Sequence, residues 1–153
     1  MPPEIWVAII GLLAAAMLYR STVLVARKNL FVSTVTTERA KWRDDMRLAT
    51  IGLSKAARQA LANPSYDSFN ALEEFRVAIR LRLNPSDDSK DKFDQKILAG
   101  LRVLSQAVRL QREVQTLTEL EAIERNMQEL LKQEWEKSKQ EAQTGELMPG
   151  KSP

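Results

Sequence analysis

The apolar residues of the chain follow two patterns, an almost unbroken run near the N-terminus and a helical periodicity further along. Residues 5–19 contain no charged side chain. From about residue 37 onward, apolar side chains recur at steps of three or four, the spacing of one face of an α-helix. The pattern predicts an all-α protein with one N-terminal transmembrane helix, followed by a cytoplasmic antiparallel bundle of three to four helices.

The apolar run crosses a membrane only if its helix continues past Arg20. Fifteen residues make a helix of roughly 22 Å, which is short for a hydrocarbon core of about 30 Å. Continuation to Ala26 gives 22 residues and about 33 Å, which is sufficient with some tilt. No basic residue precedes the run, and the run is apolar all round, which argues against a signal peptide and against an interfacial helix. We therefore predict a membrane anchor within residues 1–28.

The flanking residues predict the orientation of this anchor. Lysine and arginine cluster only after the run, beginning with Arg27 and Lys28. The positive-inside rule then places the N-terminus outside and the remaining residues in the cytoplasm, at a bacterial inner membrane. Trp6 is expected at the outer membrane interface, where tryptophan is enriched.

Helical angles divide the anchor into two faces. Ala8, Gly11 and Ala15 share one face, and small residues at this spacing let two membrane helices approach closely. Arg20 lies about 180° from Gly11. We expect its long side chain to reach the cytoplasmic headgroups beside Arg27 and Lys28. The alternative is an arginine that lines an oligomeric pore.

Two similar sequences divide the remainder of the chain into helices: NPSYD at 63–67 and NPSDD at 84–88. In each, Asn and Pro end one helix, while Ser and Asp cap the next. Thr36 or Thr37 would cap the first helix, and overlapping capping boxes predict a further break near 116–118. The predicted helices are 37–62, 68–83, 89–115 and 118–143, within a domain of residues 29–143, followed by a flexible tail at 144–153. A continuous helix from 89 to 143 is the alternative.

Each predicted helix carries one apolar stripe, and these stripes form the expected core. Trp42 and Trp135 both fall on stripes, so packing in the core is expected for each. The other members are Met46, Ala49, Leu53, Ala56 or Ala57, Ala60, Leu72, Phe75, Ile79, Leu83, Phe93, Ile97, Leu101, Leu104, Val108, Leu120, Ile123, Met127 and Leu130 or Leu131.

The composition excludes most catalytic chemistry. The chain has no histidine and no cysteine, so imidazole bases, thiolate nucleophiles and the usual zinc ligands are missing. Adjacent carboxylates such as Glu73 and Glu74 diverge by about 100° on a helix and do not converge on one point. No glycine-rich phosphate loop is present. We predict that the protein is not an enzyme, with no catalytic, cofactor-binding or metal-binding residues and no small-molecule substrate.

The charges are distributed unevenly along the chain. Residues 20–62 carry nine Lys or Arg against three acids, whereas residues 113–146 carry nine Glu against four bases. Arg39, Arg43 and Arg47 lie at steps of four on one helix face. This face either is solvated or forms a patch for anionic lipid headgroups or nucleic acid. Nucleic acid is the weaker alternative because no groove-reading motif accompanies the arginines.

Three segments resemble a group of uncharacterised short bacterial proteins that have one N-terminal span. They are TTERAKWRDDMRLAT at 36–50, LRLNPSDD at 81–88 and LLKQEWEKSKQE at 130–141. The resemblance covers roughly residues 5–141. It implies a shared fold and a bacterial or phage origin, and it carries no activity or catalytic residue. The chain departs from the group at Arg43, where an aliphatic residue is usual.

Three functions are consistent with these observations. The first is a non-enzymatic, single-pass protein whose cytoplasmic bundle binds itself or a protein partner, as a scaffold or regulatory subunit. The second is a membrane-permeabilising effector, resembling a toxin or a phage-defence protein, whose span oligomerises. The third is a membrane anchor for nucleic acid. Membrane lipids are partners in all three.

Overall fold

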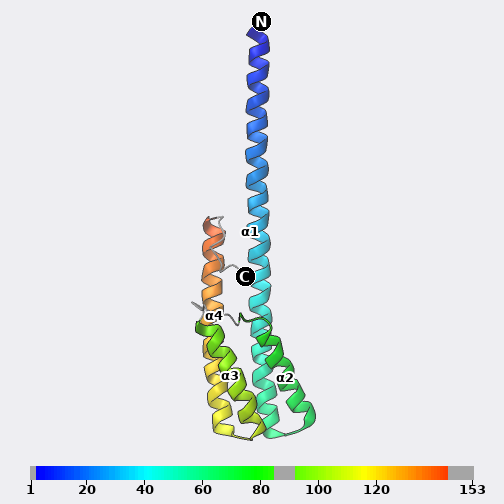
Figure 1. The fold of residues 1–153 in the computed structure, drawn as a ribbon, viewed down its shortest axis with the longest axis vertical. Coiled ribbons are helices and arrows are strands. Elements are labelled where there is room, and N and C mark those ends of the chain that lie inside the picture. The colour runs from blue at the N-terminus through cyan, green and yellow to red at the C-terminus, as the bar shows by residue number, and fades with distance from the viewer. Residues whose placement is uncertain (1–2, 85–91, 145–153) are drawn as a thin grey trace. The chain divides into compact units, whose positions relative to one another are not determined.

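All described secondary structure is helical, as the sequence predicts. A computed structural model describes the backbone of residues 3–84 and 92–144; the side chains of residues 3–10, 12–14, 24, 25, 27–29, 31 and 92 are outside its description. Along the chain the elements are α1 (Pro3–Ala62), α2 (Tyr66–Arg80), α3 (Lys92–Arg109) and α4 (Glu113–Thr144) (Figure 1). No strand occurs in these described ranges. Residues 85–88 of the second turn sequence and most of the tail lie outside them.

Helix α1 runs without interruption through the position where the sequence predicts a new helix. The prediction that Thr36 or Thr37 caps a helix is wrong. The Thr36 hydroxyl donates to the Val32 carbonyl at 3.0 Å, and the Thr37 hydroxyl donates to the Ser33 carbonyl at 2.9 Å. Threonine hydroxyls form such bonds to the preceding turn inside helices. The same residue type that caps a helix is therefore accommodated here within one.

The chain divides into two compact units, and the division differs from the predicted one at residue 28. One unit comprises Met1–Glu38 together with Lys137–Pro153, and the other comprises Arg39–Glu136. In the first unit, Val32, Ser138 and Glu141 are buried. The hydroxyls of Ser21 and Thr22 each donate to the Leu18 carbonyl, at 2.8 and 2.9 Å.

The unit Arg39–Glu136 is a bundle in which segments of all four helices lie side by side (Figure 1). Consecutive helices run in opposite directions. The core predictions are largely confirmed, because every stripe contributes buried side chains: Met46, Leu53, Ala57 and Ala60 from α1, Leu72 and Ile79 from α2, Ile97, Leu101, Leu104 and Val108 from α3, and Leu120, Ile123, Met127, Leu130 and Leu131 from α4. Leu83 is buried beyond the end of α2.

The two predicted core tryptophans differ in their surroundings. Trp42 packs against the core, and its indole N–H donates to the Arg82 carbonyl at 3.3 Å. The prediction for Trp135 is wrong, because 49% of this residue is exposed. Steps of four residues advance a helix position by about 40° beyond a full turn. Trp135 is two such steps from the buried Met127, so it has rotated about 80° away from the core.

Close packing within the bundle requires glycine at one position of α1. An ideal Cβ at Gly52 would overlap the ring of Phe75 on α2, 2.6 Å from Cδ1 and closer still to Cε1 and Cζ. At Gly100 of α3, the corresponding Cβ would lie 2.9 Å from Cγ1 of Ile123 on α4. Glycine at these sites lets neighbouring side chains lie directly on the helix backbone.

Two different capping motifs stabilise the turns between α1 and α2 and between α3 and α4. Ser65 caps α2 in a reciprocal capping box with Ser68, as the Asn-Pro-Ser sequence predicts. The turn between α3 and α4 lies at residues 110–112, several residues before the predicted break, and excludes a continuous helix from 89 to 143. Gln111 adopts φ 54°, and the N–H of Arg112 donates to the Ala107 carbonyl at 2.9 Å. This is a Schellman motif with glutamine in the place usually taken by glycine.

The Gln111 side chain explains why glutamine is accommodated in that turn. Its amide nitrogen donates to the carbonyl of Ala60 at 3.2 Å and to that of Val108 at 3.1 Å. The carbonyls in the last turn of a helix lack partners within the helix. Gln111 therefore caps the end of α1 while it closes α3, and so it ties two helices together.

Among the described residues, no helix has an apolar stretch long enough to cross a membrane. Within the predicted anchor, the side chains of residues 5–10 and 12–14 are outside the description.

Candidate functional site

A groove follows the seam between α1 and α4 within the unit Arg39–Glu136. It consists of two adjoining hollows with volumes of about 650 and 350 Å³. Thr50 and Ile51 of α1 and Glu124 of α4 line both hollows, so the two are continuous. We call this feature the α1–α4 groove and define it by these two hollows.

Apolar side chains form much of the larger hollow. Met127 and Leu131 of α4 are buried and form its floor. Ile51 of α1 and Trp135 of α4 stand at its sides and are 52% and 49% exposed. Half-exposed tryptophan beside an apolar floor is typical of surfaces that bind other proteins, because tryptophan contributes a large area at a small cost in conformational entropy.

Two side-chain hydrogen bonds join α1 to α4 along the seam that holds the groove. The Ser54 hydroxyl donates to Oε1 of Glu124 at 2.5 Å. Further along, the buried Arg43 donates from Nη1 to the Glu134 carbonyl at 3.4 Å. Both contacts join helices that run in opposite directions, which makes the groove a preformed feature of the bundle.

The charges on the groove are mainly positive. Its lining includes four cations, Arg47, Lys55, Arg58 and Lys132, and one anion, Glu124. Arg47 also forms an exposed ion pair with Asp44 at 2.5 Å. Among the residues that the structure describes, Lys55, Arg58 and Lys132 form no ion pair. The groove therefore presents an apolar floor with a basic edge on α1, while its α4 edge carries Lys132 and the hydrogen-bonded Glu124.

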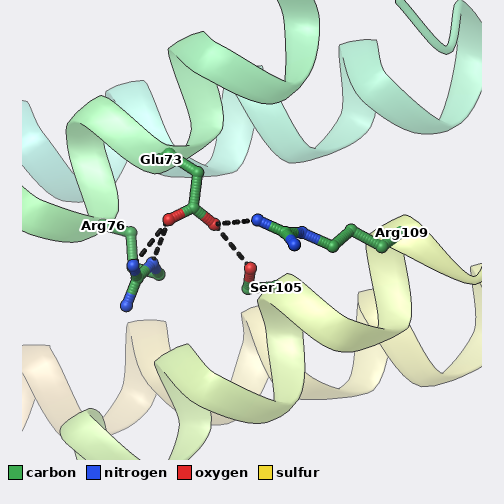
Figure 2. Close-up of polar contacts among 4 residues, drawn as sticks. All are labelled: Glu73, Arg76, Ser105 and Arg109. Carbon is green, nitrogen blue, oxygen red and sulfur yellow. Dashed lines mark hydrogen bonds and ion pairs between the residues drawn. The ribbon is translucent and has the colours of Figure 1, made fainter. Parts of the chain in front are cut away.

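A polar cluster joins α2 to α3 (Figure 2), and none of its residues lines the groove. Glu73 of α2 accepts from Nε of Arg76 at 2.7 Å and from the Ser105 hydroxyl of α3 at 2.6 Å. Nη2 of Arg109 lies 3.6 Å from the same carboxylate. Burial raises the pKa of Glu73, but the hydrogen bonds from Ser105 and Arg76 and the charges of Arg76 and Arg109 together lower it below its usual range.

This cluster has the character of a structural clamp. Its single carboxylate is surrounded by donors and is held in the charged state, so it is poorly suited to accept a proton as a general base. No group of three acidic side chains within the described ranges lies close enough to hold a metal ion. The α1–α4 groove is therefore the better candidate for a functional site.

The arginines predicted as a patch for anionic lipid headgroups or nucleic acid do not form one surface. Arg43 is buried and bonded to α4, Arg39 is partly buried, and Arg47 is exposed beside Asp44. Arg39 and Arg43 also make other polar contacts. In this arrangement Arg43 is not accessible to a phosphate, and only Arg47 contributes its charge to the groove.

The structure describes three of the residues singled out in the predicted anchor. Gly11, Ala15 and Arg20 are exposed, and nothing lies within 4 Å of an ideal Cβ at Gly11. The side chains of Trp6, Ala8, Arg27 and Lys28 are outside the described residues. The packing role of the small-residue face stays a prediction.

Sequence reasoning missed the groove and its two exposed apolar side chains. Ile51 follows Leu48 by three residues, and both are exposed. These two large aliphatic residues lie outside the apolar stripe of α1, and this position was the sequence signal that could have indicated an exposed apolar surface. The relation of Trp135 to α1 depends on the pairing of α1 with α4, which the sequence does not specify.

Comparisons with known proteins add no relative. No protein-family model, curated protein sequence or solved structure matches the chain.

Proposed function

We propose that this is a non-enzymatic, single-pass membrane protein whose helical bundle binds a protein partner through the α1–α4 groove, as a scaffold or regulatory subunit. The observation that carries the proposal is the groove itself, with Trp135 and Ile51 half exposed beside an apolar floor. A large exposed aromatic side chain in a preformed hollow between two helices is typical of helix-binding surfaces.

The membrane anchor of this proposal is supported by the sequence and by two hydrogen bonds. Residues 5–19 carry no charge. The hydroxyls of Ser21 and Thr22 are both satisfied by the Leu18 carbonyl, which lowers the cost of polar groups in lipid. In this proposal the N-terminus is outside, the bundle is cytoplasmic, and Arg20, Arg27 and Lys28 lie at the inner headgroups. The exposed Gly11 and Ala15 would pack against a second membrane helix, in a homo-oligomer or beside a membrane partner.

Site-specific photocrosslinking in cells tests the proposal. A benzoylphenylalanine at Gln128, an exposed residue that lines the groove, should form an adduct with a protein in the membrane fraction. The same group at Glu74, an exposed residue of α2, should not. Trp135→Ala should abolish the adduct from Gln128. Equal yields from the two positions, or an adduct that survives Trp135→Ala, would contradict the proposal.

Two further measurements separate the alternative functions. Overexpression should leave the membrane potential unchanged; depolarisation that Gly11→Leu or Arg20→Leu removes would instead identify a permeabilising effector. The purified protein should lack hydrolytic and transferase activity, and an activity abolished by a single carboxylate substitution would refute the non-enzymatic assignment.

A further inference from the structure

We infer that the partner element bound by the α1–α4 groove is an acidic amphipathic helix, an inference that rests on the proposed function and adds the chemistry of the partner. Three properties of the groove point to this occupant: its length, its apolar floor and the sign of the charges along its edges.

The length of the groove matches a short helix. Its lining residues on α1 extend from Arg47 to Arg58, and eleven helical steps correspond to roughly 17 Å, or about three turns. The walls are two antiparallel helices at a fixed separation, held by the Ser54–Glu124 bond. An amphipathic helix fits such a groove by placing residues i, i+3, i+4 and i+7 on the floor.

The floor of the groove supplies the apolar contact that such a helix requires. Met127 and Leu131 are already buried, so the added burial on binding comes mainly from Ile51 and Trp135, each about half exposed. Truncation of a hot-spot tryptophan at an interface typically costs at least about 2 kcal/mol, or roughly thirtyfold in affinity. Trp135 is therefore expected to dominate the affinity.

The edges of the groove determine the sign of the partner's charge. Lys55 and Arg58 lie on the α1 side and Lys132 on the α4 side. The single acid, Glu124, accepts a hydrogen bond from Ser54. A helix with glutamates flanking its apolar face would place carboxylates beside these cations, whereas lysines there would be repelled. Nucleic acid is also anionic, but it would leave the apolar floor unused.

A pair of matched peptides tests the inference on the full chain in phosphatidylcholine nanodiscs. Both are amphipathic helices of about five turns with the same leucine face; one carries glutamate at every polar position and the other carries lysine. Binding is measured by fluorescence anisotropy of labelled peptide across a salt series. The glutamate peptide should bind at least about tenfold more tightly at low salt, with the difference shrinking as salt increases.

Charge reversal provides the matched control. The double variant Arg58→Glu with Lys132→Glu should invert the preference between the two peptides. Arg80→Glu with Arg102→Glu reverses two exposed cations on α2 and α3 and should leave the preference unchanged. Trp135→Ala should weaken binding of the glutamate peptide by at least about tenfold.

The outcomes distinguish this inference from the proposed function. Equal affinity for the two peptides, no binding of either, or a preference unaffected by the groove reversal would overturn the acidic helix. A DNA duplex that displaces the glutamate peptide, or a crosslink from Gln128 to a second copy of this chain, would overturn it as well. If the peptide experiment fails in any of these ways, a crosslink from Gln128 to a different protein would still support the proposed function.

Discussion

Replacing Gly52 with alanine tests whether α2 lies directly on the backbone of α1. The new methyl group would overlap three atoms of the Phe75 ring, so the ring or the helix must move. Overpacking of this kind costs about 1–3 kcal/mol, and we expect the upper end because three ring atoms are affected. Alanine gains about 1 kcal/mol over glycine in helix propensity. The net expectation is destabilisation by about 2 kcal/mol.

Urea unfolding of the full chain in nanodiscs, followed by tryptophan fluorescence, measures this change. With a denaturant slope of about 1–3 kcal/mol per molar, the midpoint should fall by roughly 1 M. Gly100→Ala is the matched control. Its methyl would overlap one atom, Cγ1 of Ile123 at 2.9 Å, with Cδ1 of the same side chain at 3.4 Å, and the gain in propensity should offset most of the cost.

A rescue variant separates the clash from other effects of alanine. Phe75→Leu replaces the ring above Gly52 with a smaller aliphatic side chain. It should therefore lower the free energy of unfolding less in the Gly52→Ala background than in the wild type. The coupling between the two substitutions should be at least about 1 kcal/mol. An unchanged or raised midpoint for Gly52→Ala, or additive effects of the two changes, would show that Phe75 does not pack on α1.

Three further predictions concern the turn, the polar clamp and the buried arginine. Gln111→Gly should be more stable than Gln111→Ala by about 1–2 kcal/mol in urea unfolding. Both variants lose the bond to Ala60, but only alanine keeps the cost of a left-handed conformation. Equal stability of the two variants would contradict the positive φ at residue 111. Glu73→Gln should destabilise the bundle at neutral pH. Because the folded pKa of Glu73 is lowered, its contribution is present above the pKa of the unfolded chain and is lost as pH falls through the folded value. The difference from wild type should therefore shrink in acid, and a difference that grows would refute the clamp. Arg43→Met should lower the free energy of unfolding by at least about 1 kcal/mol and Arg47→Met by less than about 0.5 kcal/mol, since of the two only Arg43 is buried and bonded to α4. The reverse order would place Arg43 at the surface.

The helical content and most of the core could be predicted because both depend on local periodicity. Residues such as Met46, Leu53, Ile97 and Leu101 recur at helical spacing and are buried. The start of the first helix could not be predicted in the same way. Threonine hydroxyls either cap a helix or bond to its preceding turn, and the local sequence at Thr36 and Thr37 does not distinguish these states.

The turn and the groove depend on contacts between distant parts of the chain. Gln111 is stabilised in its turn by the carbonyl of Ala60, 51 residues earlier. Arg43 is buried because α4 supplies the Glu134 carbonyl. The groove exists because α1 pairs with α4 and because Trp135 has rotated out of the core. None of these relations is encoded in a short window of sequence.

Labelling of single cysteines in native membranes tests most directly whether a partner occupies the groove. The chain contains no cysteine, so Gln128→Cys in the groove and Asn70→Cys, at an exposed position on α2, each provide one thiol. A membrane-permeant maleimide should label Gln128→Cys several-fold more slowly in native membranes than in the purified protein, and Trp135→Ala should remove this protection. Asn70→Cys should react at the same rate in both. Equal rates for Gln128→Cys in membranes and in purified protein would contradict the account.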